Sequence, residues 1–163
     1  MGCSKGDSDC YEDESPSHEV TVSRGFWLGR TEVTVGAYSD LGGEIADRPG
    51  CFSSLPPKDH AMACVTWDQA VAFAERIGKR LPTETEYEYA ATNGGTRKRL
   101  TDAPEDWTFG PVGTDRGDVC HLDPQRPVYG LYSDVAEWTG SRFCLYPSMA
   151  SLPLTEEHRQ YRV

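Results

Sequence analysis

Cysteine is the residue type of this chain with the most direct chemical potential, because a thiolate can bind a metal, attack an electrophile or form a disulfide. The chain has six: Cys3, Cys10, Cys51, Cys64, Cys120 and Cys144. No two of them form a C-x-x-C pair, so neither structural zinc nor a thioredoxin-like redox site is supported. An even number of cysteines in loop-like sequence is typical of disulfides, and buried free thiols in a cytosolic protein are the alternative.

Proximity along the chain suggests how these cysteines pair. Cys3 and Cys10 flank a loop that contains Gly and Ser and needs a covalent cross-link to hold it, so they form the best candidate pair. Cys51–Cys64 and Cys120–Cys144 would follow by proximity, although the sequence alone leaves the connectivity open. Disulfides of this kind predict an oxidising environment, which means an extracellular, cell-surface or periplasmic location.

Two carboxylates near the end of a loop, Asp134 and Glu137, are the second candidate for chemistry. With backbone carbonyls between them, they offer the oxygen ligands that calcium prefers. The alternative is an exposed aspartate and a glutamate that is buried against a helix end or paired with arginine. The acidic run over residues 7–14 lacks the glycine of an EF-hand loop and is interpreted as a solvated loop.

Several other function classes have no support in the sequence. There is no G-x-S-x-G motif, P-loop or dinucleotide fingerprint, and the isolated His60, His121 and His158 have no carboxylate or thiol at ligand spacing. A net charge of −10 argues against a nucleic-acid partner. No window of the sequence is apolar enough for a membrane span.

The elements that must position these residues are short. At 163 residues with 16 Gly and 11 Pro, the chain predicts one domain, residues 1–163, with many turns. Alternating apolar residues predict strands at 18–22, 25–29, 135–139 and 160–163. Helical spacing predicts helices at 35–41, 66–77 and 83–92.

The predicted helices have clear start signals. Thr34 can cap the first helix, and Thr66 with Gln69 forms a capping box at the second. Pro82 stops any helix from running through, so Thr83 and Glu86 can begin the third. This last start lies in the stretch R-L-P-T-E-T-E-Y-E-Y-A-A, residues 80–91.

That stretch is one of five ordered blocks that resemble a known family, the formylglycine-generating enzymes or sulfatase-modifying factors. The family motifs are M-G-x with E-x-P-x-H-x-V, F-x-[IL]-x-x-x-E-V-T, V-[ST]-W-x-x-A, R-L-P-T-E-x-E-W/Y-E-x-A-A and G-L-Y-D-M-x-G-N-V-x-E-W-T. The matching residues are 1–3 with 14–20, 26–34, 65–70, 80–91, and 130–132 with 135–139. The resemblance implies an α+β fold of the C-type-lectin-like class, with two helices around a twisted antiparallel sheet and much irregular structure.

The departures from the family pattern affect its chemistry. Only Ser133 and Asp134 stand where the family has D-M-x-G-N, and the R-G-G-S segment with the copper-binding cysteine pair has no counterpart. None of the six cysteines lies in a matching motif. The resemblance therefore implies a scaffold without the usual C-terminal catalytic segment and without copper. It also assigns calcium, in a structural role, to Asp134 and Glu137.

Residues 140–154 mix aromatic, aliphatic and hydroxyl side chains without a helix or strand period. Such a mixture on irregular backbone is typical of binding surfaces, and an ordinary loop that packs its apolar residues inward is the alternative. The candidate ligand-binding residues in and around it are Trp138, Ser141, Arg142, Phe143, Leu145, Tyr146, Ser148, Met149 and Tyr161.

The leading hypothesis is therefore a non-catalytic module that binds or displays, with a protein, another macromolecule or a carbohydrate as ligand. Proteins of this lectin-like subtype include the variable proteins of diversity-generating retroelements, whose diversified residues lie toward the C-terminus, as they would here. One alternative is a truncated or divided formylglycine-generating oxidase that acts on a cysteine of a sulfatase-type substrate. Another is a sensor or structural domain of a larger protein.

Overall fold

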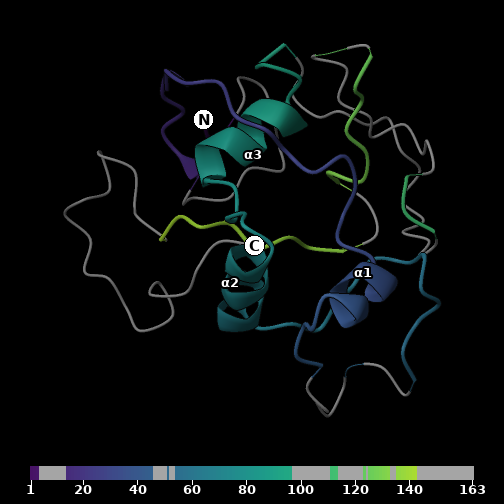
Figure 1. Ribbon diagram of the computed structural model, residues 1–163. Helices are drawn as coiled ribbons and strands as arrows, with labels where there is room; N and C mark the ends of the chain where they lie inside the picture. Colours follow the sequence, from purple (N-terminus) through teal and green to yellow (C-terminus); the bar gives the residue numbers. More distant parts are fainter. Residues whose placement is uncertain are drawn as a thin grey trace.

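Three helices organise the part of the chain that the computed structural model describes, namely residues 1–3, 14–45, 51, 54–96, 111–113, 123, 125–132 and 135–142. They are α1 (Val35–Asp40), α2 (Trp67–Arg76) and α3 (Glu84–Ala91) (Figure 1). No helix in these ranges has the length and apolar character needed to cross a membrane.

Each helix begins at a threonine, as the sequence predicts. Thr34 accepts a hydrogen bond from the backbone N–H of Ala37 at the start of α1. At α2 and α3 the capping is reciprocal, because Gln69 and Glu86 also return a bond to the backbone N–H of Thr66 and Thr83. The predicted helices at 35–41, 66–77 and 83–92 are confirmed to within one or two residues at their ends.

The described core lies on two faces. Ala90 and Ala91 of α3 pack against Leu131, and partly buried residues surround them: Leu28, Tyr87, Val128 and Tyr132. Alanines on this face of α3 let the backbone of residue 131 come close. On the other side, the rings of Tyr38 in α1 and Phe73 in α2 lie 4.6 Å apart between centroids.

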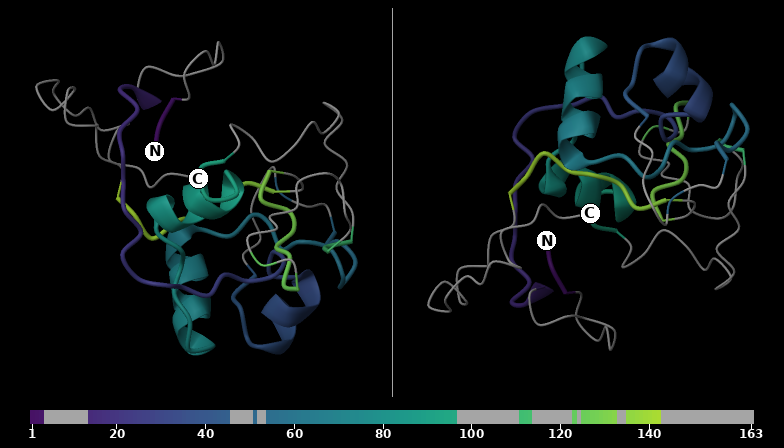
Figure 2. Two further views of the ribbon diagram at one scale, coloured as in Figure 1. Left: turned by 90° about the horizontal axis from the view of Figure 1, so that it is seen from above. Right: turned by 90° about the horizontal axis from the view of Figure 1, so that it is seen from below.

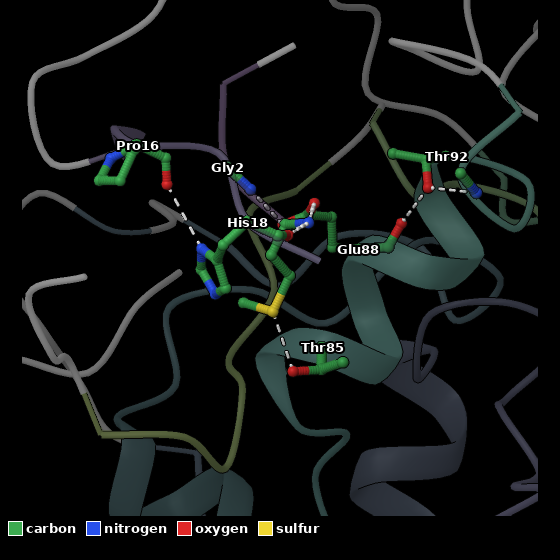
Figure 3. A network of polar contacts seen from close by, with 8 residues as sticks. Gly2, Pro16, His18, Thr85, Glu88 and Thr92 are labelled. Carbon is green, nitrogen blue, oxygen red and sulfur yellow. Dashed lines mark hydrogen bonds and ion pairs between the residues drawn. The ribbon is translucent and has the colours of Figure 1, made fainter. Parts of the chain in front are cut away.

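The N-terminal segment is fastened to the outer side of α3 (Figure 3). The amino group of Met1 lies 3.3 Å from one carboxylate oxygen of Glu88, and the N–H of Gly2 donates to the other. The Thr85 hydroxyl donates to the Met1 sulfur. Residues 1–3 also pair with 14–18, because the N–H of His18 donates to the Met1 carbonyl. Helix α3 therefore holds Met1 and Gly2 directly, and residues 14–18 are held through their bonds to residues 1–3.

The predicted strands at 18–22, 25–29 and 135–139 are not strands in the structure. Within the described residues there are isolated bridges and no ladder: Thr34 pairs with Ala61 and His60 with Pro111, both antiparallel, and Val128 and Arg142 are also bridge residues. A ladder needs consecutive bonds between two neighbouring backbones. Here the bonds go elsewhere, since the Thr139 carbonyl accepts from the Trp67 indole. The predicted antiparallel sheet is thus not seen among the described residues, and the predicted strand at 160–163 lies outside them.

A disulfide joins Cys51 and Cys64, with 5.9 Å between their Cα atoms. Proximity in the sequence suggested this pair. Cys3 is also disulfide-bonded, to a partner outside the described residues. The other predicted partners, Cys10, Cys120 and Cys144, lie outside the described residues as well. The Cys51–Cys64 bond is compatible with an oxidising, extracellular or periplasmic environment.

The start of α3 should make stability depend on pH. Arg80 donates two hydrogen bonds of 2.7 Å to the Glu86 carboxylate, which also accepts from the Thr83 N–H. The Arg80 bonds, followed by those from Thr83, lower the pKa of Glu86 from 4.5 to about 2. Because the folded pKa is the lower one, this pair stabilises the fold above the unfolded pKa. That contribution is lost as pH falls from 4.5 toward 2.

We therefore expect the chemical-denaturation midpoint of the wild type to fall more steeply than that of Glu86→Gln between about pH 5 and pH 3. At neutral pH the substitution should cost about 1 kcal/mol, because Arg80 is largely exposed. Glu75→Gln, at an exposed position of α2, should keep the wild-type pH dependence. Identical acid slopes for the wild type and Glu86→Gln would contradict the assignment.

Candidate functional site

The segment 135–142 lies beside the starts of α2 and α3 (Figure 2). The Trp67 indole N–H donates to the Thr139 carbonyl at 2.8 Å. The N–H of Gly140 donates to the Pro82 carbonyl at 2.7 Å. These two bonds attach the backbone of the segment to Trp67, the first residue of α2, and to Pro82, which precedes the cap of α3.

Ser141 adds a side-chain contact to the same junction. Its hydroxyl accepts a hydrogen bond of 2.9 Å from the backbone N–H of Glu84, the first residue of α3. The first N–H groups of a helix have no partner within the helix. Ser141 therefore completes the capping of α3 from a segment that is 57 residues away in the chain.

Trp67 and Trp138 join the segment to the start of α2 in both directions. The indole of Trp138 donates to the Val65 carbonyl at 3.0 Å, while the indole of Trp67 donates to Thr139. Val65 directly follows Cys64, which the disulfide holds to Cys51. Both tryptophans are half-buried. Their apolar bodies and their single polar atoms are thus both used to hold the junction together.

The structure describes three of the predicted ligand-binding residues. Trp138 and Ser141 have the contacts given above, and Arg142 is exposed at the end of the segment. The remaining candidates lie outside the described residues: Phe143, Leu145, Tyr146, Ser148, Met149 and Tyr161. The described part of the predicted surface is therefore an anchored base that ends at an exposed arginine.

A group of buried acidic and phenolic side chains surrounds Glu137. Burial and then the nearby Glu137 carboxylate raise the pKa of Tyr87, and Glu32 contributes in the same direction. The Tyr87 hydroxyl donates to the Leu131 carbonyl. Glu32 is only 7% exposed, and a side chain at Gly130 would overlap its carboxylate. We did not predict Glu32 or Tyr87 for this site, although both stand in blocks that resemble the family.

Of the predicted metal pair, the structure describes only Glu137, since Asp134 lies outside the described residues. In the described ranges, no group of three or more His, Cys, Asp or Glu side chains could hold a metal ion. What these ranges supply is two carboxylates, Glu32 and Glu137, near one tyrosine hydroxyl. This donor set is smaller than the six to eight oxygens that calcium usually takes.

Comparison with known proteins identifies the protein family. Residues 1–118 match the sulfatase-modifying factor enzyme 1-like domain. The chain therefore belongs to this family, whose fold is C-type-lectin-like and whose members include enzymes. No solved structure matches the chain.

Individual relatives match only in part. The formylglycine-generating enzyme of Thermomonospora curvata is 45% identical over 53 residues, which are 32% of this chain and 14% of that protein. The enzyme of the same name from Bos taurus is 50% identical over 42 residues, 26% of this chain and 11% of the relative. The serine/threonine-protein kinase pkn1 of Chlamydia pneumoniae is 57% identical over 89 residues, 48% of this chain and 13% of the kinase. This chain thus spans a small part of the length of each relative.

The indole bond of Trp138 should be measurable in stability. Replacing Trp138 by Phe keeps an aromatic ring but leaves the Val65 carbonyl without its donor, so we expect a loss of about 1–2 kcal/mol in the free energy of unfolding. Trp27→Phe is the matched control, because the Trp27 side chain is exposed and should cost less than about 0.5 kcal/mol. Equal costs for the two variants would show that the bond to Val65 does not stabilise the junction.

Proposed function

We propose that this chain is a non-catalytic binding module, in which the segment beginning at Trp138 presents ligand-contacting side chains. The observation that supports this is the anchoring of residues 138–141 to both helix starts, with Arg142 exposed directly afterwards. A binding segment gains precision when rigid elements hold its base. The proposed ligand is a protein, another macromolecule or a carbohydrate.

The display form of this proposal is a variable protein of a diversity-generating retroelement. It requires that the ligand-contacting positions after Trp138 differ between copies while the anchored base stays the same. Trp138 and Ser141 contact the helix starts, so a change at either would disturb the scaffold. Residues from Arg142 onward would carry the variation. An extracellular, cell-surface or periplasmic location goes with this proposal and is supported by the Cys51–Cys64 disulfide.

The second candidate is a formylglycine-generating oxidase that is present here in part. The names of several relatives favour it. Copper in such an enzyme would need free thiolates, which are the soft ligands that select Cu(I). Cys3, Cys51 and Cys64 are disulfide-bonded and do not fit that role. Cys10, Cys120 and Cys144 lie outside the described residues, and we favour the binding module because of the anchoring of residues 138–141.

A third candidate is a sensor or structural domain of a larger protein. It is supported by the match to a chlamydial protein kinase, which covers 48% of this chain but only 13% of the kinase. A binding module within a longer protein would unite this candidate with the first. The two differ in whether ligand binding is passed on to another domain.

Selection from a random peptide library and a glycan array tests the binding proposal. We expect the folded chain to yield binders whose affinity falls at least tenfold in Arg142→Ala, since truncation of an interface arginine commonly costs more than about 1.4 kcal/mol. Lys79→Ala, also exposed, is the matched control and should leave affinity unchanged. Failure to obtain any binder with an intact fold would contradict the proposal. Copper-dependent oxygen uptake with a cysteine-containing peptide would establish the oxidase instead.

We also propose a structural calcium ion at Asp134 and Glu137, as the family resemblance implies. A cation there would offset the repulsion between the Glu137 and Glu32 carboxylates, which lie near the same tyrosine. We expect millimolar Ca²⁺ to raise the Tm of the chain by a few degrees over EDTA, because a ligand of the folded state stabilises it. Glu137→Gln should abolish this rise, whereas Glu75→Gln should retain it. A Tm that is the same in Ca²⁺ and EDTA would rule the ion out.

A further inference from the structure

Trp27 is far more exposed than any other large hydrophobic residue that the structure describes. Its exposed fraction is 85%, whereas the next, Leu41, is at 51%. A positively charged group lies over its ring: the Arg126 guanidinium is 5.1 Å from the ring centroid. This is the geometry of a cation–π contact. It covers little of the ring, so most of the indole surface remains open to solvent.

A second pair of the same kind lies next to the first in the chain. The Arg30 guanidinium is 5.4 Å from the centroid of the Tyr129 ring. The backbone N–H of Tyr129 donates to the Arg30 carbonyl at 2.9 Å, which fixes the two segments side by side. Each segment therefore contributes one aromatic ring and one arginine, three residues apart, and the pairing crosses between the segments. We call Trp27, Arg30, Arg126 and Tyr129 the aromatic–arginine surface.

The turn that carries Arg126 is held in place. Asp123 accepts hydrogen bonds from two backbone N–H groups, that of Gln125 through its side chain and that of Arg126 through its carbonyl. The Arg126 side chain is 66% exposed, and its Nε lies 4.0 Å from the Asp123 carboxylate. An exposed ion pair at this distance contributes little to stability. The guanidinium thus lies between the Trp27 ring and the Asp123 carboxylate, and most of the Arg126 side chain is exposed.

A guanidinium that stacks on an aromatic ring keeps its in-plane N–H donors available for a carboxylate. Tryptophan, tyrosine and arginine are also the residues enriched at the centres of protein–protein interfaces. The chain as a whole carries a net charge of −10, so this local pair of cations stands out from an acidic background. Such contrast steers anionic groups toward the aromatic–arginine surface.

We propose that the aromatic–arginine surface docks an acidic segment of a partner protein, with carboxylates on Arg126 and Arg30 and an apolar side chain on the open face of Trp27. A long sulfated polysaccharide suits the surface less well, because the rest of this acidic chain would repel it. A short acidic peptide needs only the two arginines and the indole. This surface uses none of the residues assigned above to ligand binding after Trp138.

The test is fluorescence anisotropy with a labelled synthetic peptide that has glutamates at alternate positions and one central leucine. Its control replaces every glutamate by glutamine. We expect the glutamate peptide to bind and the glutamine peptide not to bind. Trp27→Ala should weaken binding about tenfold and Arg126→Ala about fivefold, as expected for central interface residues. Arg126→Lys keeps the charge but loses the planar fork, and should weaken binding by about threefold.

Two control variants separate this proposal from the others. Lys79→Ala removes an exposed cation elsewhere and should bind as the wild type does, and Arg142→Ala should also leave this affinity unchanged. Equal binding of the glutamine peptide, or unchanged binding in Trp27→Ala with an intact fold, would overturn the proposal. So would binding of heparin without binding of the acidic peptide. Self-association that Trp27→Ala abolishes would assign the surface to a second copy and overturn it likewise.

Discussion

The first turn of α3 carries the constraint on which the described structure depends. Its polar groups find partners in separate parts of the chain. Thr83 and Glu86 cap each other, and Arg80 donates to the Glu86 carboxylate. The Ser141 hydroxyl accepts from the N–H of Glu84. Buried or half-buried helix ends need partners of this kind. The turn joins the R-L-P-T-E stretch, the segment after Trp138 and, through Thr85, the N-terminal residues. The role of this turn is to hold separate segments of the chain together.

The sequence predicted the elements whose signals are local. Thr34, Thr66 and Thr83 mark the starts of all three described helices, because capping depends on residues only three positions apart. Strands were harder to predict, since a ladder depends on a neighbouring strand that can come from any part of the chain. The segments at 18–22 and 135–139 have the alternation of strands, but in the second the Thr139 carbonyl accepts from the Trp67 indole, and the next N–H, that of Gly140, donates to the Pro82 carbonyl.

The same distinction applies to the candidate site. Glu137 was foreseen from its own motif, yet its proximity to Tyr87 and Glu32 joins three blocks that are far apart in the sequence. Each of these residues reads locally as an ordinary member of its element, and only the fold brings the charges together. Likewise, the sequence makes Trp138 a candidate ligand-binding residue. Its bond to the Val65 carbonyl shows a structural role as well, because it joins two segments that are far apart in the sequence.

Family membership implies a lectin-like scaffold, and the described helices α2 and α3 are both capped within it. Proteins named formylglycine-generating enzyme and proteins named serine/threonine-protein kinase both contain stretches similar to parts of this chain. A lectin-like domain can serve in both settings because its fold and its sites are separable. For this chain, the residues that anchor the scaffold and those proposed to meet a ligand are largely different.

Gly130 lies where these two sets of residues come closest. It has a positive φ of 76°, and its missing side chain leaves room for the Glu32 carboxylate. On one side of it in the chain is Tyr129, which supports Arg30, and on the other is Leu131 in the core. A side chain at position 130 is therefore costly in two ways, because its backbone has a positive φ and its Cβ would overlap the buried Glu32 carboxylate.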